Sequence, residues 1–414
     1  MMSWDLSPPE TSALKDHDVA PQGQHLQGKK IALLISGSIA AYRTPDLVRD
    51  LRREGADVVV FATQESLRYV AKESLEWTSL HKVIDEFTAD AEHLSDAFPF
   101  DAWLVAPATY SVINKMACGI ADSVVTSTLA SALGKLERFH KPVLLAPAMH
   151  GSMHNSILTK SMEELQQKGV ILIPPRQENG KNNLPSNEIL TAHTIRALNQ
   201  SMLKEKSILI TGGPTPVPID HIRRITTHFT GALAIEIARE AWFRGADVRL
   251  LLGKGSHTPP VFLQSQMAST FDEYKTRILE SLTRQTFHCG IFSAAVADYQ
   301  PEMIHPGKIP SGTAELSLKL VPTPKVIQLV RQQFPELFMV TFKYEENLSH
   351  QALMNIARKR LEQNYNLVVA NRGEESGPHG EQVAWLVAPG LEEVSATGKP
   401  QIAKALINYL ENSL

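Results

Sequence analysis

The stretch KKIALLISGSIAAYR, residues 29–43, joins an apolar run to a turn of small residues. The run at 31–35 is short and continuous, which is typical of a strand buried on both faces. After the turn, residues 39–54 have apolar side chains at helical spacing, and Gly55 is a helix stop. The stretch therefore predicts a strand–turn–helix unit.

The same pattern recurs along the chain. Further apolar runs lie at 57–63, 101–109, 141–149 and 169–175, and a second series at 206–215, 247–256, 288–299, 337–346 and 366–372. Strands of this kind separated by helices predict parallel sheets with helices on both faces. We expect two Rossmann-like, three-layer α/β domains that meet in the polar segment 199–206. Ligands are expected at the carboxyl ends of the strands.

Composition limits the class of protein. The 414 residues exceed one ordinary domain, and a net charge of −3 with scattered Lys and Arg favours a small-molecule partner over nucleic acid or a membrane surface. Cys118 and Cys289, the only cysteines, indicate a reducing, cytoplasmic location. No run reaches the ~18 apolar residues of a membrane span. Residues 1–27 are expected to form a mobile leader.

Two stretches indicate chemistry. Ser36, Gly37 and Ser38 precede a helix, where amides and the helix dipole bind phosphate, although a tight turn also requires small residues. LLAPAMHGSMHN, residues 144–155, places His150 and His154 four apart. A shared metal would suit this spacing on a helix, but Pro147 and Gly151 disfavour one. Residues 154 and 155 are expected to cap a helix or face solvent.

Three motifs occur in order in the first half: GSIAAYR at 37–43, APATYSVINKMACGIADSVVTS at 106–127 and APAMHGSM at 146–153. In this set, residues 28–198 closely resemble the flavin-containing phosphopantothenoylcysteine decarboxylases. The resemblance implies a flavodoxin-like domain over 28–200 that binds FMN. It assigns the FMN contacts to Gly37, Ser38, Thr63, Pro107, Ala108, Thr109 and Thr126.

The same resemblance assigns catalytic residues. His93, in DAEHLSDA, is the candidate base, because an imidazole titrates near neutral pH. His150 stands where the family usually has an Asn that binds the substrate carboxylate, and an imidazole can also donate to a carboxylate. The family's flap cysteine, which protonates the enethiol, is missing from RQENGKNNLPSNE, 176–188, where Gly180 and Pro185 indicate a mobile loop. Without this cysteine, either another donor or water protonates the enethiol, or the enethiol itself is the product.

The second half also carries an ordered motif set. It comprises GGPT at 212–215, PID at 218–220, SAAVADY at 293–299, GKIPSG at 307–312, LVPTPKVI at 320–327, TFKYEEN at 341–347 and VVAN at 368–371. Residues 205–390 thereby resemble phosphopantothenoylcysteine synthetases, which implies a ribokinase/Rossmann-like ligase domain over 205–414. The lysine that stabilises phosphate charge is Lys308 by motif position. The implied nucleotide and substrate contacts are Gly213, Thr215, Arg223, Thr227, Asp298, Phe342 and Lys359.

The implied reaction activates 4′-phosphopantothenate on a nucleoside triphosphate, and the amine of cysteine then attacks the acyl nucleotide. Negative charge builds on phosphate oxygens, so Mg²⁺ is expected, with Asp298 facing the nucleotide or its metal. Thr227 replaces the Asn that handles the intermediate in the family. Lys359 favours CTP, whereas Gln363 and FKYEE, 342–346, are closer to versions that use ATP.

Together the two resemblances imply an enzyme of coenzyme A biosynthesis that makes 4′-phosphopantetheine. One alternative is an active ligase joined to a flavoprotein domain with impaired or partial decarboxylation. A second is a non-catalytic, phosphatase-regulating binding protein of the same fold, which retained His93, Lys308 and Asp298 argue against. The resemblance also implies a homo-oligomer, either trimers or a dodecamer of trimers joined by ligase dimers.

Overall fold

The computed structural model describes residues 6–8, 10–94, 99–312, 315–391 and 393–414. The chain divides into two compact units, Met1–Leu198 and Asn199–Leu414. Each unit is described by itself.

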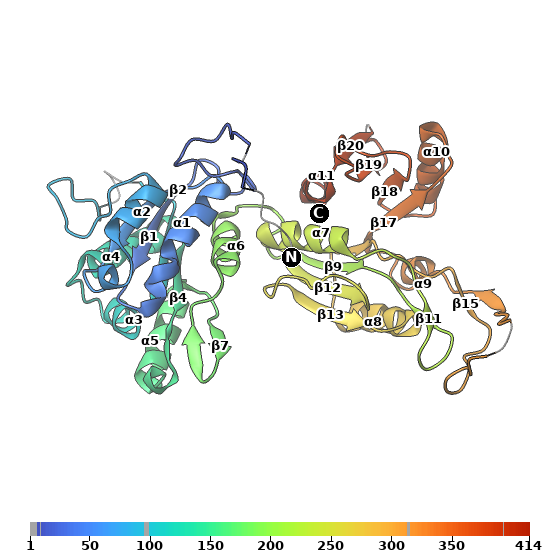
Figure 1. Cartoon of the computed structure of the whole chain (residues 1–414), viewed down its shortest axis with the longest axis horizontal. Helices are drawn as coiled ribbons and strands as arrows, with labels where there is room; N and C mark the ends of the chain where they lie inside the picture. The colour runs from blue at the N-terminus through green and yellow to red at the C-terminus, as the bar shows by residue number, and fades with distance from the viewer. Residues whose placement is uncertain (1–5, 9, 95–98, 313–314, 392) are drawn as a thin grey trace. The chain divides into compact units, whose positions relative to one another are not determined.

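Unit 1 is built on a parallel sheet in the order β2-β1-β3-β4-β6 (Figure 1). The strands are β1 (Lys30–Ile35), β2 (Asp57–Ala62), β3 (Ala102–Ala108), β4 (Val143–Pro147) and β6 (Ile171–Leu172). This is the flavodoxin-like strand order, whose connections reverse direction between β1 and β3. The point of reversal is where a ligand is expected.

Helices cover both faces of this sheet. Apolar residues of α3 (Tyr110–Ala117), α4 (Val124–Phe139) and α5 (Ser156–Gln167) form one core with β1 to β4. On the other face α1 (Thr44–Arg53) packs beside α2 (Lys72–Ser79) and α6 (Asn187–Leu198) (Figure 1). Three short 3₁₀ helices, η1 (Ile39–Arg43), η2 (Ser66–Arg68) and η3 (Gly151–Met153), lie in the connections. The predicted three-layer arrangement is confirmed.

The segment before β1 packs against the end of α1. The amides of Gln22 and Gly23 donate to the Arg53 carbonyl at 2.9 and 3.2 Å, and the Leu26 amide donates to Glu54 O at 2.9 Å. The Leu26 side chain is fully buried. The last residues of the expected leader therefore contribute to the core of unit 1.

A three-stranded antiparallel sheet adjoins the main sheet of unit 1. Its order is β5-β8-β7, formed by β5 (Met149–His150), β8 (Lys181–Asn183) and β7 (Arg176–Glu178). The segment expected to be a loop is thus a β7–β8 hairpin, because Asn179 and Gly180 both have positive φ, 51° and 69°. An Asn-Gly pair favours the two-residue hairpin turn that needs this conformation.

Unit 2 contains an eight-stranded sheet in the order β13-β12-β9-β14-β17-β18-β19-β20 (Figure 1). Its strands are β9 (Ser207–Gly212), β12 (Asp247–Gly253), β13 (Gln264–Ala268), β14 (Cys289–Phe292), β17 (Phe338–Glu345), β18 (Leu367–Arg372), β19 (Val383–Val387) and β20 (Val394–Thr397). The first six are parallel in the Rossmann order, with the reversal between β9 and β14. β19 and β20 are antiparallel additions that the sequence did not predict.

Two helices cover one face of the unit 2 sheet and three the other. The core formed by α7 (Ala232–Phe243) and α11 (Lys399–Glu411) lies on one face. Helices α8 (Phe271–Arg284) and α9 (Val326–Gln333) form a second core, and α10 (His350–Leu361) packs on β18. Two ribbons, β10 (Val217–Pro218) with β11 (Arg224–Ile225) and β15 (Tyr299–Pro301) with β16 (Leu320–Pro322), complete the unit.

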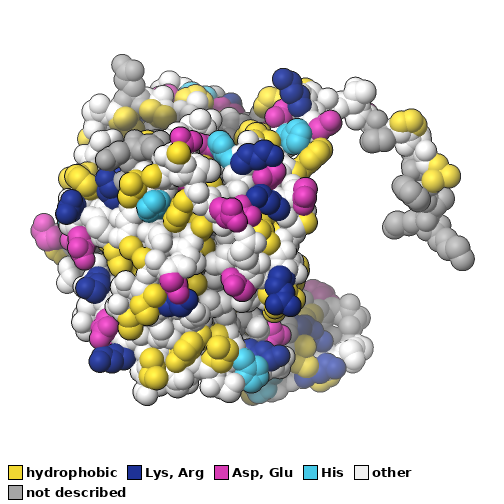
Figure 2. Space-filling model, turned by 90° about the vertical axis from the view of Figure 1, so that its left-hand side faces the viewer, with side chains coloured by type: hydrophobic (Ala, Val, Ile, Leu, Met, Phe, Trp, Pro, Cys, Tyr) yellow, Lys and Arg dark blue, Asp and Glu magenta, His cyan; other side chains and the backbone are white. Residues whose placement is uncertain are grey.

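Basic and acidic side chains are interspersed over the face drawn in Figure 2. This mixed surface agrees with the scattered charges of the sequence. Among the helices of the described residues, none is both long and apolar enough to span a bilayer.

Two candidate active sites

The turns after β1 and β3 meet where the strand order of unit 1 reverses. The buried Ser36 hydroxyl donates to the Pro107 carbonyl at 2.7 Å and accepts from the Thr109 amide at 3.1 Å. A Cβ on Gly37 would lie 2.7 Å from Glu65 Cβ, so the turn after β1 needs glycine. The predicted FMN contacts around Ser36 and Thr109 therefore lie side by side.

The polar groups of these turns suit an anion. The Ser38 side chain caps η1 by accepting from the Ala40 amide at 3.3 Å, and Thr109 immediately precedes α3. Thr63 follows β2, and its hydroxyl accepts from the Ser66 amide at 3.2 Å. The hydroxyl of Thr126 serves a different purpose, because it accepts from the amides of Asp122 and Ser123 at 3.0 and 2.9 Å in the cap of α4.

His93 follows a segment that runs beside the end of β2. Its Nδ1 is buried and has no hydrogen-bond partner among the described residues, and its ring lies 4.1 Å from that of Phe87. The adjacent Glu92 accepts from the Thr88 amide and hydroxyl at 3.0 and 2.5 Å. Burial raises the pKa of Glu92, but the bonds from Thr88 outweigh it and the pKa is below its ordinary value. A fixed, ionised neighbour thus precedes the candidate base.

His150 lies between the β3 turn and the hairpin. The Ala148 amide donates to the Ala108 carbonyl at 3.1 Å, and His150 pairs with Lys181 of β8. The exposed His150 ring bonds through Nδ1 to the Ser152 hydroxyl at 2.8 Å and accepts from the Ser152 amide at 3.2 Å. With Nδ1 engaged in this way, Nε2 is the nitrogen available to a substrate carboxylate.

The second histidine of this segment has another role. His154 Nδ1 lies 3.0 Å from the Asn182 side-chain nitrogen of the hairpin. Asn155 caps α5, accepting from the amides of Ile157 and Leu158 at 3.1 and 3.2 Å, so the expected cap is confirmed. Since an amide nitrogen donates, His154 accepts at Nδ1 and links the hairpin to the segment after β4.

In unit 2 the turns after β9 and β14 meet at the corresponding reversal. The Ala295 amide donates to the Gly213 carbonyl at 2.9 Å, and the Ala297 amide donates to the buried Thr215 hydroxyl at 2.8 Å. Gly213 has φ 76°, and a Cβ there would lie 1.8 Å from Ser256 Oγ. The GGPT and SAAVAD motifs therefore form one continuous edge.

Asp298 stands at this edge with an exposed side chain. Its carboxylate forms an ion pair with Lys325, and its carbonyl accepts from the Thr323 amide at 2.9 Å. No cluster of three or more metal-ligating side chains occurs in the described part of the chain. One carboxylate still fits Mg²⁺, which in nucleotide sites uses one or two carboxylates and takes its other ligands from phosphates and water.

Phe342 lies within β17, and Thr227 lies in the segment after β11. The Phe342 carbonyl accepts from Arg360 Nη1 at 2.6 Å, and burial lowers the pKa of Arg360. Lys359, the basic residue singled out by the resemblance, is exposed. Its neighbour Arg360 is the residue that bonds to the Phe342 carbonyl. The Thr227 hydroxyl is buried without a hydrogen-bond partner in the described residues.

Arg223 and Lys308 lie on two loops that contact each other. Arg223 Nη1 donates to Asp220 Oδ2 at 2.9 Å and to the Ile309 carbonyl at 3.2 Å. Lys308 precedes Ile309 and has an exposed side chain. The structure thus brings these two predicted residues into one loop pair.

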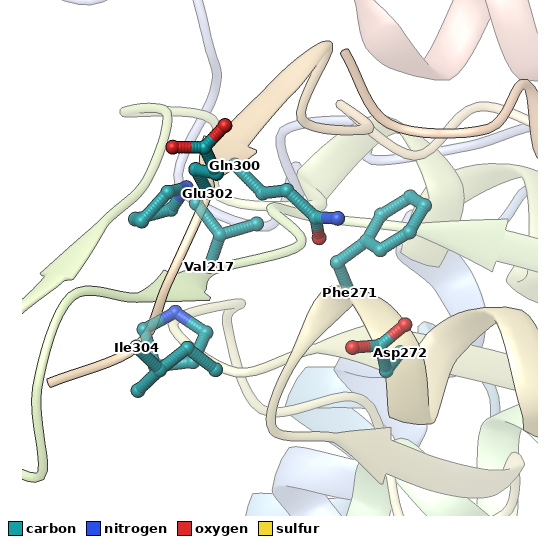
Figure 3. Close-up of a pocket in the computed structure, with 8 residues that line it drawn as sticks. Val217, Phe271, Asp272, Gln300, Glu302 and Ile304 are labelled. Carbon is teal, nitrogen blue, oxygen red and sulfur yellow. The ribbon is translucent and has the colours of Figure 1, made fainter. Parts of the chain in front are cut away.

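A cavity of about 260 Å³ lies beside this loop pair (Figure 3). It is lined by Val217, Pro218, Phe271, Asp272, Gln300, Pro301, Glu302 and Ile304. Its two carboxylates have basic partners, since Asp272 pairs with Lys275 at 2.9 Å and Glu302 with Lys319 at 2.7 Å. The sequence did not predict this cavity.

Family models divide the chain in the same order as the two sites. Residues 19–199 match the Flavoprotein family and residues 203–414 match the DNA/pantothenate metabolism flavoprotein C-terminal domain. A flavoprotein domain is thus joined to a pantothenate metabolism domain.

Curated relatives share both domains. The chain is 35% identical over 402 residues to the coenzyme A biosynthesis bifunctional protein CoaBC of Thermococcus kodakarensis, covering 95% of this chain and 98% of that protein. The proteins of the same name from Methanocaldococcus jannaschii and Escherichia coli are 33% and 32% identical, covering 84% of this chain and 84% and 86% of theirs. The chain belongs to the family of bifunctional coenzyme A biosynthesis proteins.

Because the chain belongs to this family, it is an enzyme with decarboxylase and ligase roles, as the sequence predicted. The alternative of a purely regulatory binding protein is not supported. Among solved structures, the DNA/pantothenate metabolism flavoprotein from Streptococcus pneumoniae is 25% identical with a TM-score of 0.46. It covers 51% of this chain and 100% of its own.

Proposed function

We propose that unit 1 binds FMN at the β1–β3 reversal and decarboxylates 4′-phosphopantothenoylcysteine to 4′-phosphopantetheine. The observation that carries this proposal is the Ser36 bridge, which joins two turns rich in small residues beside the starts of η1 and α3. Such turns bind the phosphate of a flavin nucleotide. Bound FMN supplies the two-electron oxidation at the cysteinyl carbon that makes loss of carbon dioxide possible.

The chain's own residues bind and orient the substrate in this proposal. His150 donates from Nε2 to the substrate carboxylate, because Ser152 already engages Nδ1. His93 is the base, with a buried Nδ1 that no described residue contacts by a hydrogen bond. In the described hairpin, residues 176–183 contain no cysteine, so the proton that completes reduction comes from another donor or water, or the product is an enethiol.

Unit 2 is proposed to ligate 4′-phosphopantothenate to cysteine with a nucleoside triphosphate. Gly213 and Thr215 bind phosphate oxygens, Asp298 faces the nucleotide or a Mg²⁺ ion, and Lys308 stabilises the charge of the acyl-transfer steps. Phe342 lines the nucleoside pocket, where Arg360 holds its carbonyl. We favour CTP over ATP because Lys359 of α10 matches a basic position of the CTP-using members of the family that the sequence resembles.

Both reactions can be tested on the purified chain. A flavin absorbance band is expected, followed by pyrophosphate release with 4′-phosphopantothenate, cysteine and CTP. Carbon dioxide release from 4′-phosphopantothenoylcysteine is expected in the same preparation. Absence of pyrophosphate with both CTP and ATP refutes the ligase assignment, and absence of carbon dioxide from a flavin-loaded sample refutes complete decarboxylation. EDTA should stop pyrophosphate release if Mg²⁺ takes part.

We further propose that the protein is a cytoplasmic homo-oligomer. Ile39 and Tyr42 of η1 are 68% and 63% exposed at the edge of the β1 turn, which supports an apolar contact between copies there. Cys118 and Cys289 are both free thiols, which is compatible with a reducing compartment. Light scattering that gives the monomer mass at micromolar concentration would contradict the oligomer.

A further inference from the structure

The loop that carries Lys308 is attached to the turn 219–223 by its main chain. The His305 amide donates to the Ile219 carbonyl at 2.9 Å, and the His221 amide donates to the Gly307 carbonyl at 3.2 Å. Lys308 therefore lies between residues whose main-chain groups are held, while its own side chain is exposed.

The buried carboxylate of Asp220 connects this turn and loop. Its side chain is enclosed, with the residue 3% exposed. One oxygen, Oδ1, accepts from the amides of Ile222 and Arg223 at 2.8 and 2.6 Å. The other oxygen, Oδ2, accepts from the Ile309 amide at 3.0 Å and from Arg223 Nη1 at 2.9 Å.

The two oxygens therefore have separate effects. Oδ1 shapes the turn 220–223, whereas Oδ2 holds the residue that follows Lys308. The amides of Arg223 and Ile309 keep the pKa of the Asp220 carboxyl well below its ordinary range, so the carboxylate is ionised throughout the neutral range. Hydrogen bonds to an ionised acceptor are about twice as strong as neutral ones.

We infer that Asp220 is a positioning residue of the ligase, which fixes the main chain at Ile309, directly after Lys308, and so directs the Lys308 ammonium group at the reacting phosphates. This inference rests on the proposed role of Lys308. A lysine loop without this anchor must be ordered in each turnover, and misplacement of a charged group by about 1 Å can reduce a rate about 100-fold. Arg223 supports the same anchor through the Ile309 carbonyl.

The Asp220→Asn variant separates the two effects. With its carbonyl oxygen in the place of Oδ1, the amide keeps both bonds of the turn. Its NH₂ group then replaces Oδ2 and faces two donors, the Ile309 amide and the Arg223 guanidinium. The variant should therefore fold and keep the main-chain bonds at His305 and Gly307, while the Ile309 side of the loop is released. Glu280→Gln is a matched control, because it removes one negative charge from an exposed ion pair with Arg284 on α8.

Two measurements on the full-length, flavin-loaded chain test the inference. Trypsin cleavage at the Lys308–Ile309 bond, followed by mass spectrometry of the fragments, should be about 10- to 100-fold faster in Asp220→Asn. The kcat for pyrophosphate release should fall about 10- to 100-fold, with a KM for CTP close to that of the parent. Carbon dioxide release by unit 1 of Asp220→Asn should equal that of the parent. In the Glu280→Gln control, both the cleavage rate at Lys308 and the kcat for pyrophosphate release should equal those of the parent.

Each contrary result is distinct. Unchanged cleavage at Lys308 overturns the anchoring by Asp220. Faster cleavage with an unchanged kcat, while Lys308→Ala is inactive, overturns the positioning role and leaves Lys308 as the functional lysine. Full ligase activity of Lys308→Ala refutes the proposed role of Lys308 itself.

Discussion

Gly151 is the position where a single methyl group should separate the hairpin from the His150 segment. A Cβ on Gly151 would lie 2.1 Å from the Gly180 carbonyl oxygen, about 1.3 Å short of an ordinary contact. The obstacle is main chain, so a side-chain rotation cannot relieve it. In Gly151→Ala the β7–β8 hairpin must move away by roughly an ångström.

The expected effect is on catalysis more than on stability. A displacement of about 1 Å beside His150 should lower the rate of carbon dioxide release by up to about 100-fold, which corresponds to about 2.7 kcal/mol. Flavin content should be unchanged because the obstructing atom is the Gly180 carbonyl oxygen of the hairpin, whereas the Ser36 bridge bonds only Pro107 and Thr109. Single-turnover release of carbon dioxide from 4′-phosphopantothenoylcysteine measures this rate, and ligase activity provides an internal control.

Gly134→Ala is the matched variant for this test. Gly134 lies inside α4, and a Cβ there would have no neighbour within 4 Å. Alanine should stabilise the helix by about 1 kcal/mol and leave turnover unchanged. If Gly151→Ala releases carbon dioxide at the parent rate, the hairpin does not position the substrate, and the reasoning is refuted.

Three further predictions concern unit 1. His150→Ala should retain the flavin absorbance band and abolish carbon dioxide release; normal turnover would remove His150 from the carboxylate site. Leu26→Ala should lower the unfolding free energy by about 2–4 kcal/mol, because a fully buried side chain is truncated; a change under about 0.5 kcal/mol in urea titration would show that the segment before β1 contributes nothing. Burial lowers the pKa of His193 to about 4. The unfolded chain therefore binds a proton near pH 6.5 that the folded chain does not. The free energy of unfolding of unit 1 should fall by up to about 3 kcal/mol as the pH falls from 6.5 to 4. His193→Gln should reduce this slope, and an identical slope would contradict the assignment.

The sequence predicted most of the fold because the buried strands are continuous apolar runs. The pattern around 31–35 and 206–215 does not depend on distant partners, and both sheets were anticipated from it. β13 and β20 were missed because most of their residues are exposed. β19 is an apolar run, but its antiparallel place in the sheet depends on pairing with β18. The β7–β8 hairpin was missed although Asn179–Gly180 is a hairpin signal.

The candidate sites were predicted unevenly for a physical reason. Motifs located the turns around Gly37 and Gly213, since a Cβ on Gly37 would meet Glu65 Cβ and Gly213 has a positive φ of 76°. The resemblance selected Lys359, but only the three-dimensional structure shows that Arg360 faces Phe342. Asp220 was similarly visible in the PID motif, yet its two-sided bonding depends on the distant residue Ile309.

The Ser36 hydroxyl has a consequence for the thermodynamics of binding at the β1–β3 reversal. Because it donates to one turn and accepts from the other, neither turn can shift alone without breaking a buried hydrogen bond. A ligand therefore meets a receptor whose two halves are already joined. Little of its intrinsic affinity is lost to ordering these turns, and the free chain is preorganised for its cofactor.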